Sequence, residues 1–281
     1  MSDTHARGKT AIVLIGGGMR SAYSAGFLYA LATKLGIQHP DIMIAASGSA
    51  GSAFYFAAGQ YESGKHIWTE LLSTPLFLSH PRVWRVMQID YLIDTVFKKQ
   101  DPLDFSAFRR SQTEMIVAVT NTKTGNAEFL DARKSSQPLE LLRATKAHPV
   151  LYRKTVEIDG ERYIDGAMGM TPQIITDEAV RRGARGILCI NEMTSRRTLV
   201  AHTLRVGRYV APSHLRTVLK QYPLATPVPM VPRDVKLLYI FPGKLPVSRL
   251  SRNKKALFDT FERGAADALA REKELRSLFN V

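Results

Sequence analysis

The stretch Ile42-Met43-Ile44-Ala45-Ala46-Ser47-Gly48-Ser49-Ala50-Gly51 joins an apolar run to a cluster of small residues around two serines. The apolar run predicts a buried strand, and the residues after Gly51 can continue as a helix. Small side chains let a chain reverse sharply from strand to helix around one exposed serine, which is the geometry of a nucleophile elbow. We take Ser49, at the centre of the cluster, as the candidate nucleophile for acyl transfer. The alternative is a small-residue turn without chemistry.

A second cluster, Gly16-Gly17-Gly18-Met19-Arg20, follows an apolar run at 10–15 that predicts another buried strand. Consecutive glycines let the backbone approach a ligand closely and turn its N–H groups toward it. Such a loop can hold a phosphate or the oxyanion of an acyl-transfer intermediate. The segment lacks the Lys-Ser or Lys-Thr pair of a P-loop and the last glycine of a dinucleotide-binding motif. The oxyanion role is therefore favoured over the phosphate role, with a structural turn as the alternative.

The third segment of interest, Asp165-Gly166-Ala167, ends a strand-like run. Residues 155–164 predict a hairpin with Asp159-Gly160 at its turn, so Asp159 is interpreted as a turn former. Asp165 is either a catalytic base or a cap for the next helix, which should begin near Thr171-Pro172.

In their order and spacing these three segments resemble the patatin-like phospholipases, lipid acyl hydrolases that use a Ser–Asp dyad. The family pattern is a glycine-rich loop after the first strand, then G-x-S-x-G, then Asp-Gly-Gly or Asp-Gly-Ala. A further similarity is the segment Arg143-Ala144-Thr145-Lys146-Ala147-His148-Pro149, which matches the family stretch R-A-S-x-A-x-P. The resemblance runs from about residue 9 to residue 193.

The resemblance implies roles for individual residues. Ser49 would attack an ester carbonyl, and Asp165 would accept the serine proton and later activate water. The implied oxyanion hole consists of backbone N–H groups of Gly16, Gly17 and Gly18. Arg20 would support this loop or contact an anionic head group, and no metal and no cofactor is expected.

The chain departs from the family pattern at two glycine positions. Ser47 stands at the first glycine of G-x-S-x-G, and a positive φ there would add strain of order ~1 kcal/mol. Ser21 replaces the glycine that follows the arginine. Of the seven histidines, His148 is the one beside the dyad region, so a triad of Ser49, His148 and Asp165 is an alternative. The simpler interpretation places His148 on the pocket rim.

Alternating apolar runs and helical stretches predict an α/β fold, a three-layer sandwich with a central, mostly parallel sheet and the elbow at a strand–helix turn. We expect a single patatin-like domain at 9–281 behind a polar tail at 1–8. The expected strands are 10–15, 42–46, 114–120, 127–130, 186–191 and 235–241. The expected helices are 21–35, 52–61, 139–147, 172–182, 199–220 and 253–277.

Composition bears on location and partners. The formal net charge is +14, and the chain has a single cysteine, Cys189, which excludes an internal disulfide. No apolar leader and no run of ~18 apolar residues is present, so a cytoplasmic location is expected. The basic amphipathic stretch 199–220 predicts peripheral contact with an anionic membrane, or an ordinary core-facing helix with a solvated basic face. Nucleic acid is not expected as a partner, and the oligomeric state stays open.

A second stretch that could face lipid is 71–96, where apolar residues could line an acyl-chain funnel or pack over the elbow. The function expected from all these features is hydrolysis of carboxyl esters of phospholipids or lysophospholipids. The alternatives are a non-catalytic lipid- or anion-binding protein on the same fold, and an esterase or thioesterase for soluble acyl substrates.

Overall fold

A mixed β-sheet forms the centre of the molecule in the computed structural model, which describes residues 8–79, 86–193, 213–221 and 228–281. Within these residues the sheet has eight strands in the order β5-β6-β3-β2-β1-β7-β8, and β4 pairs with β3 beside that path. The strands are β1 (Lys9–Leu14), β2 (Ile42–Ala45), β3 (Glu114–Asn121), β4 (Ala127–Asp131), β5 (Val156–Ile158), β6 (Glu161–Asp165), β7 (Ala184–Ile190) and β8 (Lys236–Ile240).

The five strands β3, β2, β1, β7 and β8 pair in parallel, whereas β4, β5 and β6 join by antiparallel pairing. The inner parallel strands are buried almost throughout, as expected for strands covered on both faces. β5 and β6 form the predicted hairpin, with Asp159 at φ 51° and Gly160 at φ 82° in its turn. Positive φ at both residues is what a two-residue hairpin turn requires.

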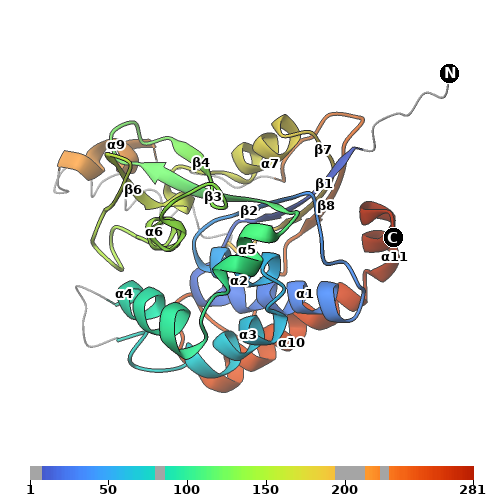
Figure 1. Cartoon of the computed structure of the whole chain (residues 1–281), viewed down its shortest axis with the longest axis horizontal. Helices are drawn as coiled ribbons and strands as arrows, with labels where there is room; N and C mark the ends of the chain where they lie inside the picture. Colours follow the sequence, from blue (N-terminus) through green and yellow to red (C-terminus); the bar gives the residue numbers. More distant parts are fainter. Residues whose placement is uncertain (1–7, 80–85, 194–212, 222–227) are drawn as a thin grey trace.

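Helices cover both faces of the sheet (Figure 1). The α-helices are α1 (Ala22–Thr33), α2 (Gly48–Ala57), α3 (Tyr61–His66), α4 (Ile89–Tyr91), α5 (Phe105–Arg110), α6 (Pro138–Thr145), α7 (Pro172–Arg181), α9 (Ser213–Gln221), α10 (Lys254–Leu269) and α11 (Glu272–Phe279). Ile67–Leu71 and Leu92–Gln100 are π-helical, and Gly18–Ser21 and Gly166–Met168 form 3₁₀ turns.

Alternate residues of the strands belong to two separate apolar cores. Ile12 and Leu14 of β1 lie in the core that includes α1, α2 and α10, while Ala11 and Val13 lie in the core that includes α7. The predicted three-layer α/β arrangement with a mostly parallel sheet is therefore confirmed.

The closest helix contact brings α1 against α10 through two glycines. A Cβ added to Gly26 would lie 1.9 Å from the carbonyl oxygen of Phe261, and one added to Gly264 would lie 2.0 Å from that of Tyr23. Only glycine at both positions allows the two backbones to approach this closely.

The predicted elements differ from the structure in three places. The predicted helix 52–61 begins earlier, at Gly48, because the chain turns at Ser47. The predicted helix 253–277 is two helices, α10 and α11, which separate at Ala270 and Arg271. Most of the predicted helix 199–220 lies outside the described residues, and its last part falls in helix α9.

Candidate active site

The turn between β2 and α2 carries the most strained serine of the site. Ser47 has φ 53° and ψ −129°, a conformation that L-residues rarely adopt. The Ser47 N–H donates to Thr145 Oγ1 at 2.9 Å, and this hydroxyl donates to the carbonyl oxygen of Ala118 at 2.6 Å. The turn has the shape of a nucleophile elbow, and it is held in place by a buried threonine at the end of α6.

A direct hydrogen bond joins the elbow to the aspartate at the end of β6. Ser47 Oγ donates to Asp165 Oδ2 at 2.8 Å, and the Ala167 N–H donates to Asp165 Oδ1 at 2.9 Å. The Asp165 N–H donates to the Ala147 carbonyl at 3.1 Å. Asp165 is 3% exposed, and burial raises its pKa to about 6. Such a carboxylate is a stronger base than an exposed aspartate.

Ser49 lies elsewhere, and the expected contact between Ser49 and Asp165 is wrong. The Ser49 side chain is fully buried in the first turn of α2, and its Oγ donates to the Ala46 carbonyl at 2.9 Å. The reversal occurs two residues before the expected position, so Ser47 faces the cavity and Ser49 faces the core. Centred on Ser47, the motif has Ala45 and Ser49 at its two glycine positions.

The glycine loop packs directly against this elbow. A Cβ added to Gly16 would lie 2.6 Å from the Ala46 carbonyl and 3.1 Å from the Ser47 Cβ. A Cβ added to Gly48 would lie 2.6 Å from the carbonyl oxygen of Gly18 and 3.2 Å from its amide nitrogen. Gly16 and Gly18 have φ values of 83° and 63°, which favour glycine.

The amides of the same loop are placed to meet a ligand. The Met19 N–H donates to the Arg249 carbonyl and the Arg20 N–H to the Gly17 carbonyl. In the described part of the chain, the N–H groups of Gly17 and Gly18 have no such acceptor. Both glycines line the cavity that contains Ser47 and Asp165, as does Gly16.

Arg20 supports the loop from behind. Its Nε donates to the Glu192 carbonyl at 2.7 Å and its Nη2 to the Gly243 carbonyl at 2.8 Å. The Glu192 carboxylate accepts from Ser21 Oγ at 2.9 Å and from the Ser24 N–H at 2.8 Å. Burial raises the pKa of Glu192 to about 7. Of the two roles expected for Arg20, these contacts favour loop support.

Glu192 was not predicted from the sequence as part of the site. The available signal was its position directly after the buried strand β7, at the sheet edge where β1 and β2 also end. Polar residues at that edge of a parallel sheet meet one another in space.

His148 lines the cavity but contacts neither dyad residue by a hydrogen bond in the described structure. Its Nδ1 accepts from the Val150 N–H at 3.2 Å. Burial and the positive charge of Arg249 lower the pKa of His148 to about 4. This geometry favours the interpretation of His148 as a pocket-lining residue over the triad.

Lys146 is a further polar residue of the cavity that the sequence analysis did not assign. Its Nζ donates to the Ser47 carbonyl and, at 3.4 Å, to the Gly48 carbonyl. The side chain is buried, and desolvation lowers its pKa to about 7. As a lysine in the last turn of a helix it gave no sequence signal, because cations are common there.

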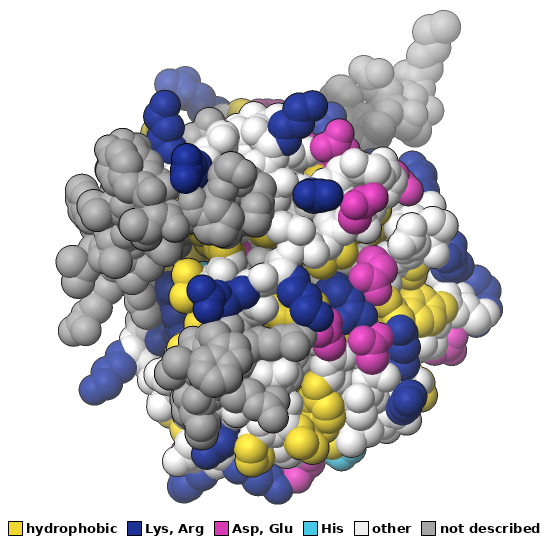
Figure 2. Space-filling view, turned by 90° about the vertical axis from the view of Figure 1, so that its left-hand side faces the viewer, with side chains coloured by type: hydrophobic (Ala, Val, Ile, Leu, Met, Phe, Trp, Pro, Cys, Tyr) yellow, Lys and Arg dark blue, Asp and Glu magenta, His cyan; other side chains and the backbone are white. Residues whose placement is uncertain are grey.

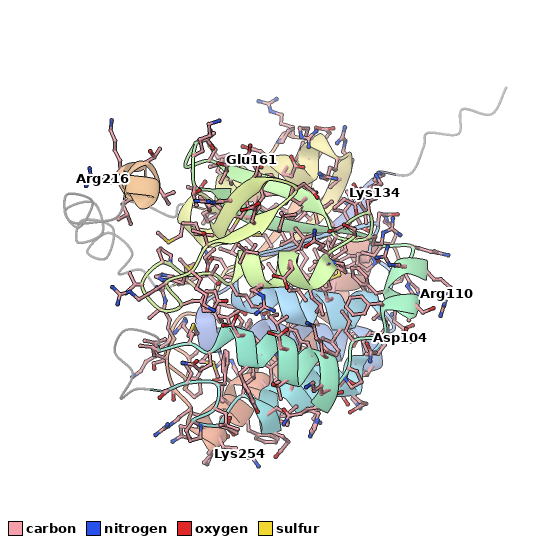
Figure 3. The ribbon with its side chains drawn as sticks, turned by 60° about the vertical axis from the view of Figure 1, so that its left-hand side comes forward. Asp104, Arg110, Lys134, Glu161, Arg216 and Lys254 are labelled. Atoms are coloured by element: carbon pink, nitrogen blue, oxygen red, sulfur yellow. The ribbon has the colours of Figure 1, made fainter. Side chains whose placement is uncertain are left out.

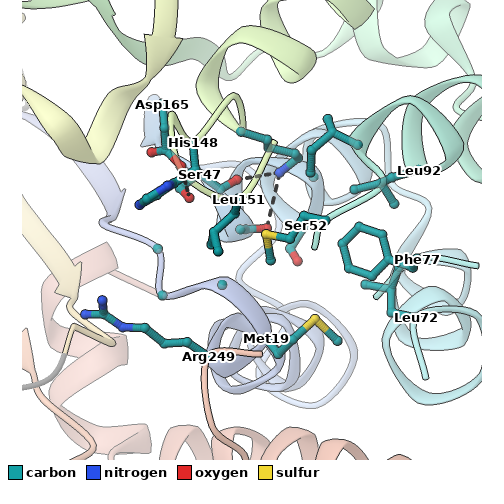
Figure 4. A pocket seen from close by; sticks show the side chains of 18 of the residues that line it. Met19, Ser47, Ser52, Leu72, Phe77, Leu92, His148, Leu151, Asp165 and Arg249 are labelled. Carbon is teal, nitrogen blue, oxygen red and sulfur yellow. Dashed lines mark hydrogen bonds between the residues drawn. The ribbon is translucent and has the colours of Figure 1, made fainter. Parts of the chain in front are cut away.

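The cavity extends from Ser47 and Asp165 into an apolar region (Figure 4). Ser47 and Asp165 lie at one end, and Leu72, Phe77 and Leu92 lie at the other. The apolar lining includes Tyr55, Ile67, Trp68, Leu72, Phe77, Met87, Ile89, Leu92, Phe97 and Leu151. Several of these belong to the stretch 71–96, for which an acyl-chain funnel and packing over the elbow were the two alternatives; Trp84 of that stretch lies outside the described residues.

The comparison with known families fits this site. The sequence profile of the Patatin-like phospholipase family matches residues 12–176, a range that contains the glycine loop, the elbow and Asp165. The chain belongs to this family. Membership supports lipid acyl hydrolase activity in general.

Two individual proteins are similar to this patatin-like chain. The uncharacterized protein YjjU of Escherichia coli K12 is 25% identical over 195 residues, which are 67% of this chain and 53% of YjjU. The chain therefore spans about half the length of that relative. VipD of Legionella pneumophila shares the fold, with a TM-score of 0.56 and 14% identity over 97% of this chain and 69% of VipD.

The surface of the molecule carries many basic side chains. Lys and Arg side chains are spread over the face in Figure 2, and Figure 3 shows Arg110, Lys134, Arg216 and Lys254 near the periphery. Among the described residues, no helix has both the length and the apolar character to cross a bilayer. Those residues also contain no group of three or more His, Cys, Asp or Glu side chains suited to a metal ion.

Proposed function

We propose that this patatin-like protein is a serine lipid acyl hydrolase that cleaves carboxyl esters of phospholipids or lysophospholipids, with Ser47 as nucleophile and Asp165 as base. The observation that carries the proposal is the 2.8 Å hydrogen bond from Ser47 Oγ to Asp165 Oδ2 at a strained elbow. Backbone strain of this kind concentrates at functional sites because the surrounding structure has to maintain it.

Proton transfer follows from the contacts of the dyad. Asp165 takes the proton of Ser47 Oγ as this oxygen attacks the ester carbonyl, and the same proton then passes to the leaving alcohol. Asp165 next removes a proton from water, which attacks the acyl group, and returns this proton to Ser47 Oγ as the fatty acid leaves. The raised pKa of Asp165 makes it a stronger base toward Ser47 and toward water than an exposed aspartate would be.

The backbone around the elbow supplies the charge stabilisation. The N–H groups of Gly17 and Gly18 are proposed to bind the oxyanion, together with the Gly48 N–H at the first position of α2. Loss of one such donor typically costs about 3 kcal/mol in the transition state. The acyl chain is assigned to the apolar region bounded by Leu72, Phe77 and Leu92.

The decisive experiment compares two serines that are two residues apart. Ser47→Ala and Ser49→Ala are tested for labelling by a fluorophosphonate probe and for fatty acid release from lysophospholipid and phospholipid. We expect Ser47→Ala and Asp165→Asn to lose at least about a thousandfold in kcat/KM. Ser49→Ala, which removes a hydroxyl bonded to the Ala46 carbonyl, should keep activity within several-fold and lose about 1 kcal/mol of stability.

Three results would redirect the proposal. Equally poor labelling of wild type, Ser47→Ala and Ser49→Ala, with liposome binding in all three, would favour a non-catalytic lipid-binding protein. Activity on monomeric esters that does not rise when substrate aggregates would favour a soluble esterase or thioesterase. Loss of labelling in Ser49→Ala, with labelling kept in Ser47→Ala, would identify Ser49 as the nucleophile.

We also propose that the protein acts from the cytoplasm at the surface of an anionic membrane. The formal charge of +14 supports this partner, because basic surfaces bind anionic lipid. Cosedimentation with phosphatidylglycerol vesicles should exceed that with phosphatidylcholine vesicles and should weaken as salt is added. Equal binding to both vesicles would contradict the electrostatic contribution.

A further inference from the structure

A buried ammonium group lies beside the candidate dyad. Lys146 is 5% exposed and lines the same cavity as Ser47 and Asp165. Its Nζ donates to the carbonyls of Ser47 and Gly48 in the first turn of α2. Both hydrogen bonds are drawn as dashed lines in Figure 4.

Lys146 is fixed in this place by its two neighbours. Thr145 Oγ1 accepts from the Ser47 N–H, and the Ala147 carbonyl accepts from the Asp165 N–H. The three consecutive residues therefore contact the two dyad residues from one short segment at the end of α6. The position of the lysine relative to the dyad is set by the same backbone that places the dyad itself.

Burial of this ammonium is costly for the fold. Removing a cation from water is unfavourable unless opposite charge or hydrogen bonds compensate. Among the described residues, the hydrogen-bond partners of Nζ are two neutral carbonyls. A lysine kept under these conditions inside a cleft is a candidate for function.

We propose that Lys146 is a positioning residue whose positive charge keeps Asp165 ionised, so that Asp165 serves as base at lower pH than its burial alone would allow. The inference rests on the proposed hydrolase function and adds a third side chain to the Ser–Asp pair. No covalent step at Lys146 is involved.

The charges that face Asp165 define what the lysine contributes. Lys146 and Arg249 both lower the pKa of Asp165 by their positive charge, and hydrogen bonds from Ser47 and Ala167 act in the same direction. His148 lies on the same cavity wall, but with a pKa lowered to about 4 it is neutral when Asp165 titrates. Of these two cations, Lys146 is the one whose side chain contacts the elbow carbonyls, so its neutral variants test the charge nearest the elbow.

The two pKa values place both charges in one pH range. Burial raises the pKa of Asp165 to about 6 and lowers that of Lys146 to about 7. Between these values the carboxylate and the ammonium are both present, and each favours the charged form of the other. Without the ammonium the pKa of Asp165 should rise by about one unit, the low end of the effect of a nearby opposite charge.

The test uses two neutral variants and a matched control. Lys146→Met keeps length and removes charge; Lys146→Gln keeps hydrogen-bond donors for the elbow carbonyls. Lys154→Met makes the same chemical change at an exposed lysine that pairs with Asp90. The Asp165 carboxyl carbon is titrated by NMR in protein labelled with ¹³C at aspartate, with Asp165→Asn to assign the signal. Ester hydrolysis is measured from about pH 5 to about pH 9.

We expect the Asp165 pKa to rise by about one unit in both Lys146 variants and to stay unchanged in Lys154→Met. The ratio of wild-type to variant kcat/KM should then be roughly fivefold larger near pH 6 than near pH 9, and it should approach about tenfold near pH 5. An unchanged Asp165 pKa in a folded Lys146 variant would overturn the inference, as would an equal loss of activity at every pH.

Failure of the hydrolase proposal would look different. In that case wild type and Ser47→Ala would show equal activity or none, while the carboxyl titration would still decide what Lys146 does to Asp165.

Discussion

Thr145 offers a sharp test of how the elbow is held. Its hydroxyl accepts from the Ser47 N–H at 2.9 Å and donates to the Ala118 carbonyl at 2.6 Å, and its side chain is fully buried. The replacement Thr145→Val keeps the shape and removes both hydrogen bonds. The Ala118 carbonyl and the Ser47 N–H would then each lose a partner.

The expected loss of stability comes from these two groups. A buried polar group without a partner costs about 1–3 kcal/mol, so the free energy of unfolding should fall by roughly 2–5 kcal/mol. Thr145→Ser is the matched control, because it keeps the hydroxyl and loses one methyl group, worth about 1 kcal/mol. Urea unfolding of the two variants measures the difference.

Activity should fall with the same substitution. The Ser47 N–H is what ties the strained turn to α6, and a displacement of about 1 Å at a reacting atom can cost about a hundredfold in rate. We expect kcat/KM of Thr145→Val to fall at least about tenfold below that of Thr145→Ser under conditions where both are folded. Equal stability and equal kcat/KM in the two variants would refute the assignment of Thr145 as the support of the elbow.

Three more predictions follow from single residues. Because burial raises the pKa of Asp165 to about 6, kcat/KM of the wild type should fall below about pH 6, and an acid limb near pH 4 would contradict this. Gly264→Ala should lower the free energy of unfolding by roughly 2 kcal/mol or more despite the better helix propensity of alanine, since its Cβ would lie 2.0 Å from the Tyr23 carbonyl; a more stable variant would show that α1 and α10 can separate. Burial raises the pKa of Glu192 from 4.5 to about 7, so its contribution to stability is present below pH 4.5 and lost as pH rises through 7. In Glu192→Gln the free energy of unfolding, measured with urea, should decrease over this pH range by about 1–3 kcal/mol less than in the wild type. An equal decrease in both proteins would mean that other groups cause the pH dependence.

The sheet could be predicted from the sequence because its inner strands are nearly continuous apolar runs. Strands covered on both faces have this pattern, whereas strands with one face in solvent alternate apolar and polar residues. The hairpin of β5 and β6 was predictable from Asp159-Gly160, a pair suited to positive φ. The break between α10 and α11 was not predictable, since neither glycine nor proline stands at Ala270 or Arg271.

The elbow shows why the motif alone does not tell which of its two serines faces the cavity. The run 45–51 contains two serines among small residues, and a sequence window centred on either one satisfies the steric demand of the turn. The side chain that faces the cavity is decided by the residue that takes positive φ. Hydrogen bonds from outside the turn, chiefly that of the Ser47 N–H to Thr145, select the first serine.

The segment 145–147 gives physical meaning to the R-A-S-x-A-x-P pattern. The hydroxyl position, Thr145, holds the elbow, and the small residue Ala147 presents its carbonyl to the Asp165 N–H. The position between Thr145 and Ala147 can be any residue in the pattern. Its side chain nevertheless lines the cavity that contains Ser47 and Asp165. A different side chain there can change the charge near Asp165 while the contacts made by Thr145 and Ala147 stay in place. In this chain the residue is Lys146, and its effect on Asp165 is therefore expected to be separable, by pH, from any effect on the fold.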